Sequence, residues 1–138
     1  MHSRMMPGLL VMLLGWILAP GLAQAVALGK IDVTSHLGEA FYAEVPLHLE
    51  KNEKRSGLSV EIAAPSDYRI LEVYRDPVLN RVRASVQNDK RGTRVKLVSD
   101  ASIESPFFNL VLKVHYGNAT SFKKYPVFLD LPSAQVSM

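Results

Sequence analysis

The sequence contains no cysteine among its 138 residues, and it has a single tryptophan. Disulfides, thiol catalysis and cysteine-ligated metal sites are therefore excluded, so the core and the hydrogen bonds must stabilise the fold. No long apolar run follows residue 25, and we expect no membrane-spanning helix there. The formal net charge is only +3. Nucleic-acid binders usually carry a stronger and more local basic excess, so nucleic acid is not an expected partner.

The first 25 residues have the pattern of a secretory signal peptide. Arg4 precedes an apolar run over residues 9–19, and Ala23-Gln24-Ala25 supplies the small residues that a signal peptidase recognises. The apolar run is shorter than the roughly 20 residues that a membrane span needs. We therefore predict cleavage after Ala25, a location outside the cytoplasm and a mature domain of residues 26–138.

Alternation of apolar and polar residues dominates the mature chain and predicts strands with one buried face. The clearest case is the hairpin over residues 105–132. Its expected buried rows are Phe108, Leu110, Leu112, Val114 and Tyr116 on one strand and Tyr125, Val127, Leu129 and Leu131 on the other. About seven such segments, at intervals near ten residues, predict an all-β protein: a single antiparallel β-sandwich, immunoglobulin-like in architecture.

Three local features add detail to this alternating pattern. Pro65 opens a helix-start signal, so we expect a short helix or an irregular crossover near residues 65–71. Pro46 has no N–H to donate, so its strand is expected to lie at a sheet edge or to carry a bulge there. A strand is expected to start at Val78, with Leu79 and Arg81 on its outward side.

The ionisable residues do not predict catalysis or metal binding. The mature histidines His36, His48 and His115 have none of the spacings typical of metal sites, and the carboxylates are scattered over strand edges and loops. No strained nucleophile turn is present. We therefore expect no catalytic residues, no metal site and no cofactor, and we expect that the protein is not an enzyme.

The one charged constellation that suggests binding is basic. If residues 88–92 form a hairpin, Arg81 and Arg83 lie across from Arg94 and Lys96 on one sheet face. Like charges that face each other across a sheet repel, so an acidic partner such as peptidoglycan would relieve them. The alternative is an ordinary solvated face. The sequence leaves both interpretations open.

Four stretches carry a family resemblance. They are the opening Leu28–Val33 with Ser35–Leu47, the strand Val60–Pro65 with Tyr68, the strand Ile103–Val114 and the closing strand Lys124–Asp130. They resemble the N-terminal periplasmic domain of the FimV/HubP family over nearly the whole mature chain. Most of the matching residues are core and turn residues, so the resemblance specifies the fold more strongly than an activity.

The resemblance implies a periplasmic location and a role in type IV pilus assembly or cell-envelope organisation. It implies a non-enzymatic protein-interaction module whose partner is an envelope or pilus-assembly protein. Peptidoglycan binding through the basic face is the alternative. Because the chain ends at Met138, without the wall-binding module, membrane span and cytoplasmic part of longer family members, the expectation is a stand-alone secreted copy.

Overall fold

The computed structural model describes residues 26–49 and 57–132. The predicted signal peptide, residues 1–25, lies outside the described residues. The described residues form eight strands, one short α-helix and one 3-10 turn. In chain order these are β1 (Ala27–Leu28), β2 (Asp32–Val33), β3 (Ala40–His48), β4 (Leu58–Ile62), α2 (Pro65–Ile70), η3 (Pro77–Arg81), β5 (Val82–Asp89), β6 (Gly92–Ser102), β7 (Phe107–Tyr116) and β8 (Ala119–Phe128).

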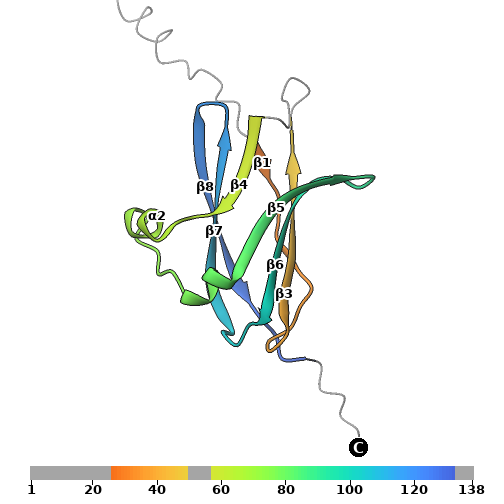
Figure 1. The fold of residues 1–138 in the computed structure, drawn as a ribbon, viewed down its shortest axis with the longest axis vertical. Helices are drawn as coiled ribbons and strands as arrows, with labels where there is room; N and C mark the ends of the chain where they lie inside the picture. Colours follow the sequence, from red (N-terminus) through yellow and green to blue (C-terminus); the bar gives the residue numbers. More distant parts are fainter. Residues whose placement is uncertain (1–25, 50–56, 133–138) are drawn as a thin grey trace, which may run out of the picture.

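The strands form two packed antiparallel sheets (Figure 1). The larger sheet has the order β1-β3-β6-β5, with β2 pairing to β3 as well, and the smaller sheet has the order β4-β7-β8. All the pairings are antiparallel. This arrangement confirms the predicted all-β sandwich, and the short helix confirms the expectation for residues 65–71.

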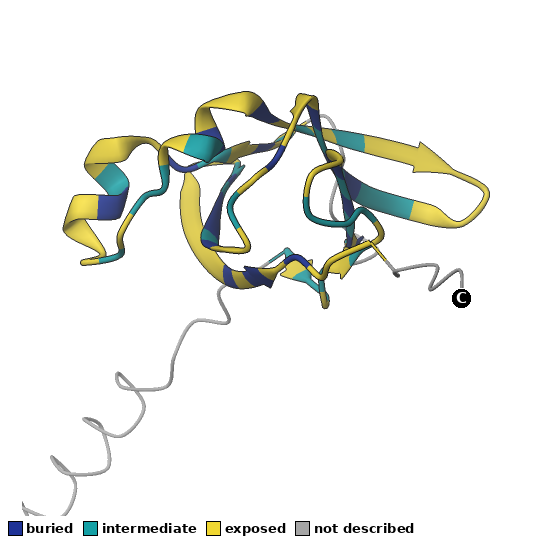
Figure 2. Cartoon of the chain, turned by 90° about the horizontal axis from the view of Figure 1, so that it is seen from below, coloured by how far each residue is buried: buried dark blue, intermediate teal, exposed yellow. Residues whose placement is uncertain are grey.

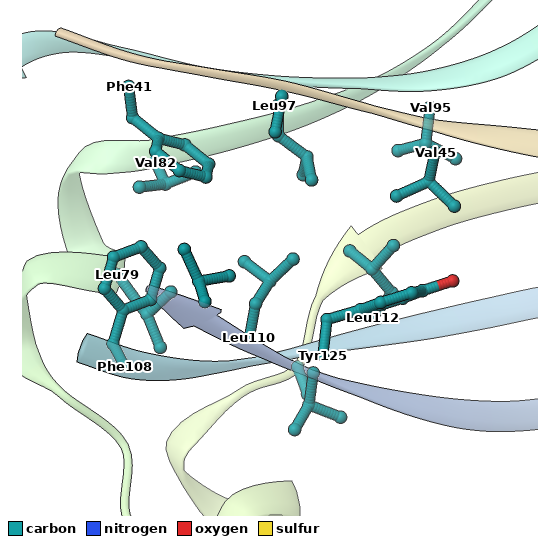
Figure 3. Packing of buried hydrophobic residues seen from close by; sticks show 14 of the residues in the cluster. Phe41, Val45, Leu79, Val82, Val95, Leu97, Phe108, Leu110, Leu112 and Tyr125 are labelled. Atoms are coloured by element: carbon teal, nitrogen blue, oxygen red, sulfur yellow. The ribbon is translucent and has the colours of Figure 1, made fainter. Parts of the chain in front are cut away.

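The core lies between the two sheets and is built from one side chain in two along each long strand. Phe41 of β3 meets Phe108 of β7 edge to face, with ring centroids 5.5 Å apart. Figure 3 shows side chains of the two sheets pointing toward one another across this layer. The predicted rows are confirmed for Phe108, Leu110, Leu112, Val114, Tyr125, Val127 and Leu129, all of them buried.

The ends of these rows reach solvent. Tyr116, beside the hairpin turn, is only half-buried. Leu131 is 74% exposed, contrary to its predicted place in the core. Strand β8 ends at Phe128, so the alternation of the sheet no longer fixes the direction of the side chain at position 131.

The expected strand start at Val78 is wrong, because residues 77–81 form the 3-10 turn η3. The Asp76 carboxylate accepts a hydrogen bond from the Val78 N–H, and Pro77 occupies the first turn, where its missing N–H costs nothing. The tighter winding turns Leu79 into the core, where it is 1% exposed. Arg81 consequently lies at the end of η3 and not in a strand.

Of the two alternatives expected at Pro46, an edge or a bulge, the edge is wrong, because β3 lies inside its sheet. Pro46 pairs with Arg94 of β6 on one side. On the other side its carbonyl accepts a hydrogen bond of 2.8 Å from Gly29 N–H, in the gap where β1 ends and β2 has not begun. Because the N and C=O of one residue point to the same side of an antiparallel strand, the missing donor falls in this gap.

The crossover that contains α2 is fixed to β7 by one hydroxyl group. Tyr68 is 1% exposed, and its Oη donates to the Asn109 carbonyl at 2.9 Å while accepting from the Val111 N–H at 2.8 Å. The Ala63 N–H donates to the Val111 carbonyl at 2.9 Å. The hydroxyl thus satisfies backbone groups of β7 beyond the point where β4 ends.

We predict that Tyr68→Phe lowers the free energy of unfolding by about 1–3 kcal/mol, because it leaves a buried N–H and a buried C=O without their partner. Urea denaturation checks this value. The matched control is Tyr74→Phe, at a side chain that is 74% exposed, and it should leave the urea midpoint almost unchanged. Equal effects of the two substitutions would contradict the prediction.

Candidate functional site

Three of the four predicted basic residues lie on the outward face of the larger sheet. Arg83 belongs to β5, and Arg94 and Lys96 belong to β6. The register places Arg83 opposite Val98, Lys96 opposite Ser85 and Arg94 opposite Gln87. The expected alignment of like charges is therefore wrong: the turn that pairs Asp89 with Gly92 sets a register without facing cations, and η3 removes Arg81 from the ladder.

Carboxylates lie beside two of these cations. Arg94, whose side chain is 12% exposed, places its Nε 2.6 Å from Glu44 Oε2 of the neighbouring strand β3. Arg94 also forms a two-pronged pair with Asp89. Arg83 forms a second two-pronged pair with Asp100, at 2.8 and 2.9 Å. Bidentate guanidinium–carboxylate contacts are strong and directional, so both cations already have anionic partners within the domain.

The remaining two cations differ in their surroundings. The Lys96 ammonium lies over the ring of Tyr42, 5.5 Å from its centroid. Tyr42 in turn donates to Glu44, the carboxylate that Arg94 binds, at 2.8 Å. Arg81 lines a shallow cavity of about 290 Å³ together with Glu104 and Ser105. Positive and negative charges are thus interspersed on this face, and binding of peptidoglycan there stays a prediction.

The outward face of the smaller sheet is partly apolar. Phe107 and Phe128 form a ring pair with centroids 4.8 Å apart, and both are substantially exposed. Phe122 is 40% exposed, with the ammonium of Lys113 5.8 Å from its ring centroid. Large exposed aromatic side chains are enriched in protein interfaces. The sequence prediction missed these three residues, and the signal that could have found them was aromatic character at positions that alternate with the buried rows.

The turn after α2 forms a second exposed apolar group. Ile70 is 80% exposed and Tyr74 is 74% exposed, and α2 projects from the side of the sandwich (Figures 1 and 2). Between them Glu72 has φ 58°, a left-handed conformation that is uncommon for residues other than glycine. Its N–H donates to the Arg69 carbonyl, and the Val73 N–H donates to the Tyr68 carbonyl, as at a helix end of the Schellman type.

The histidines of the described residues lie on different elements and contact different partners. His36 contacts Glu39 at 3.0 Å, whereas His115 contacts Thr120 and Glu61 at 3.0 and 3.3 Å. His48 is exposed at the end of β3. Within residues 26–49 and 57–132, no group of three or more histidine, aspartate or glutamate side chains converges as metal ligands would. Nor does that part of the chain contain a helix long and apolar enough to cross a membrane.

A wider cavity lies along the edges of the two sheets, where β4 and β5 pack beside each other. It has a volume of about 420 Å³ and is open to solvent. Glu61 and Ile62 of β4 line one side, and Val82, Arg83 and Ala84 of β5 line the other. Arg75 also lines this cavity, and its guanidinium donates hydrogen bonds to the Ala63 carbonyl and to Asn80.

The two antiparallel sheets, with their shared core and aromatic outer surfaces, define an immunoglobulin-like β-sandwich domain. A family model described as the FimV N-terminal domain, Ig-like, matches residues 26–132. The chain therefore belongs to the FimV N-terminal domain family. This assignment confirms the resemblance found in the sequence.

The relatives that match are longer proteins. The motility hub protein FimV of Pseudomonas aeruginosa, in two strains, is 27% identical to this chain over 118 residues. The matched region is 84% of this chain and 13% of the relative. The chain thus corresponds to a small part of each of these relatives.

We predict that Arg94→Ala lowers the urea midpoint several-fold more than Arg83→Ala. Removal of Arg94 takes its nearest cation from Glu44, a mostly buried carboxylate, and leaves only the exposed Arg91 at 3.8 Å, whereas Arg83 and Asp100 are both exposed and solvent replaces their contact. Urea denaturation of the two variants at low ionic strength checks this order. Equal midpoints would show that the Arg94–Glu44 contact contributes no more than a surface pair.

Asp89 generates a prediction about pH. The hydrogen bond from Arg94, followed by that from the Arg91 N–H, lowers the pKa of Asp89 from 3.8 to about 2. Because the pKa is lower in the folded state, the stabilisation is present above about pH 3.8 and is lost as the pH falls through about 2. An NMR titration of the Asp89 carboxyl should show the low midpoint, and Arg94→Ala should raise it. A midpoint near 3.8 in the unsubstituted protein would contradict the pairing.

Proposed function

We propose that this domain is a non-enzymatic protein-interaction module of the periplasm that serves type IV pilus assembly or cell-envelope organisation. The observation that carries the proposal is the match of residues 26–132 to the FimV N-terminal domain family. The P. aeruginosa relatives are named motility hub proteins, and this name supports a role connected with motility. The signal-peptide pattern of residues 1–25 supports export.

The surface supports the same function. Exposed aromatic and aliphatic side chains lie in two places, on the outer face of β7 and β8 and at the end of α2. Side chains of this kind give binding energy when a partner covers them, and single-domain sandwiches commonly bind through exposed faces and strand edges. An envelope or pilus-assembly protein is therefore the expected partner.

The test uses the full chain with a C-terminal affinity tag, expressed in a bacterium that carries type IV pili. We expect the mature chain, starting at Val26, in the periplasmic fraction. We also expect chemical crosslinking before lysis to capture the same pilus or envelope protein repeatedly. An unrelated exported β-sandwich with the same tag is the control. Recovery in the cytoplasm, or the same captured proteins with both baits, would reject the proposal.

A further inference from the structure

Strand β8 is an edge strand of the smaller sheet. Its inner side pairs with β7 over ten residues, from Ala119 opposite Tyr116 to Phe128 opposite Phe107. Among the described residues no strand pairs with its other side. The free side of an edge strand presents a row of N–H and C=O groups that can pair with another chain.

The hydrogen bonds around the hairpin show which residues present these groups. Tyr116 and Ala119 close the two-residue turn, and beyond the other end of β8 the Leu129 N–H donates to the Pro106 carbonyl at 2.8 Å. Because backbone groups alternate in direction along an antiparallel strand, odd-numbered residues of β8 point toward β7. The N–H and C=O groups of Thr120, Phe122 and Lys124 therefore point away from the sheet.

Pro126 has the same phase as these three residues and carries no N–H. Its missing donor costs the ladder with β7 nothing, because that position faces outward. Proline also limits pairing with a further strand at this point. The open part of the edge is thus Thr120–Lys124, which we call the β8 edge, and its five residues are all exposed.

The other edge strands of the two sheets are less accessible than the β8 edge. Strands β4 and β5 pack beside each other at the opposite side of the sandwich. Strands β1 and β2 have only two residues each. The β8 edge is therefore an exposed edge of five residues with no strand paired to it in the described part of the chain, and its neighbouring contacts are side-chain hydrogen bonds from Lys123 and Tyr125 to the carbonyls of residues 28 and 29.

The charges along the β8 edge indicate the chemistry of a partner. Lys123 and Lys124 are adjacent, and no carboxylate of the described residues lies within ion-pair distance of either. Lys123 donates to the Leu28 carbonyl at 3.1 Å and lies over the ring of Tyr125. Side chains of successive residues point to opposite sheet faces, so these two lysines offer positive charge on both sides of an added strand. Phe122 supplies an exposed apolar contact between them and the turn.

We infer that the β8 edge binds an extended acidic segment of a partner protein as a fourth strand of the smaller sheet. The inference rests on the proposed function and gives it a specific surface. Carboxylates of the partner pair with Lys123 and Lys124, and a β-branched or aromatic side chain packs on Phe122. Lysines on both faces disfavour a second copy of this chain, because two β8 edges would bring their positive charges together.

Hydrogen exchange in the free protein tests the geometry. We expect the amides of Thr120, Phe122 and Lys124 to exchange at least about tenfold faster than those of Ser121, Lys123 and Tyr125, which face β7. Similar protection of both groups would show that the edge is already covered, and it would overturn the inference.

The binding test uses an eight-residue peptide of glutamate, valine and threonine, arranged so that each face of the extended strand carries a glutamate. Its counterpart has lysine in place of every glutamate. The acidic peptide should slow exchange at Thr120, Phe122 and Lys124 and should bind at least about tenfold more tightly than the basic one. Equal affinities, no binding, or changes confined to other surfaces would overturn the inference.

Substitutions separate the backbone from the charge. Lys124→Pro removes one outward N–H but no internal hydrogen bond, so it should lower the affinity for the acidic peptide at least about fivefold. Lys124→Ala keeps the N–H and should lower this affinity less. Pro126→Ala restores a donor and should strengthen binding. The double variant Lys123→Glu with Lys124→Glu, which leaves the backbone unchanged, should abolish the preference for the acidic peptide. Dispersed NMR spectra confirm that each variant is folded.

The outcomes for the edge and for the proposed function are distinct. If Lys124→Pro captures the same envelope protein as the unsubstituted chain, the edge is not the binding surface, although the module still binds a partner. If the unsubstituted chain captures nothing specific but binds the acidic peptide, the proposed function fails and the edge stands. A dimer in sedimentation velocity that Lys124→Pro abolishes would assign the edge to a second copy and overturn the acidic-partner inference.

Discussion

The mutual burial of the inward side chains of the two sheets is the constraint on which this domain depends. Each sheet buries mainly the face that it turns to the other, so neither is stable alone, and the chain has no disulfide to replace that contact. The contact fixes the phase of every strand, because a slip of one residue would turn a whole row, such as the buried row of β7, into solvent. Phe41 against Phe108 lies within this layer.

The same phase determines the properties of the outer surfaces. Once the core residues of β6 face inward, Arg94 and Lys96 must face outward beside Tyr42 and Glu44 of β3, and the charges pair there. Once Tyr125 and Val127 face the core, the outward backbone groups of β8 belong to the even-numbered residues. The interaction surfaces are therefore a consequence of core packing as much as of their own composition.

The accuracy of the sequence predictions depended on how local the underlying physics is. Alternation predicted the core rows of β7 and β8, because period two follows from the geometry of a single strand. The proline rule predicted an edge at Pro46, whereas that residue lies inside its sheet opposite Gly29, and Pro126 occupies the true edge. The rule itself holds at both sites, since each proline sits where no N–H is needed, but the strand order that creates such sites is not local.

The sequence by itself determined the fold class and most of the buried rows of β7 and β8, because both follow from residue types and short-range periodicity, and its motifs carried the family resemblance. Tertiary structure alone decided that Arg81 lies in η3 and not on the basic face, and that β8 is an edge strand. It also decided which carboxylates pair with the arginines, namely Glu44, Asp89 and Asp100. These features depend on which strands become neighbours and in what register. Both are set by long-range packing between segments far apart in the chain, where many pairings satisfy the same local pattern.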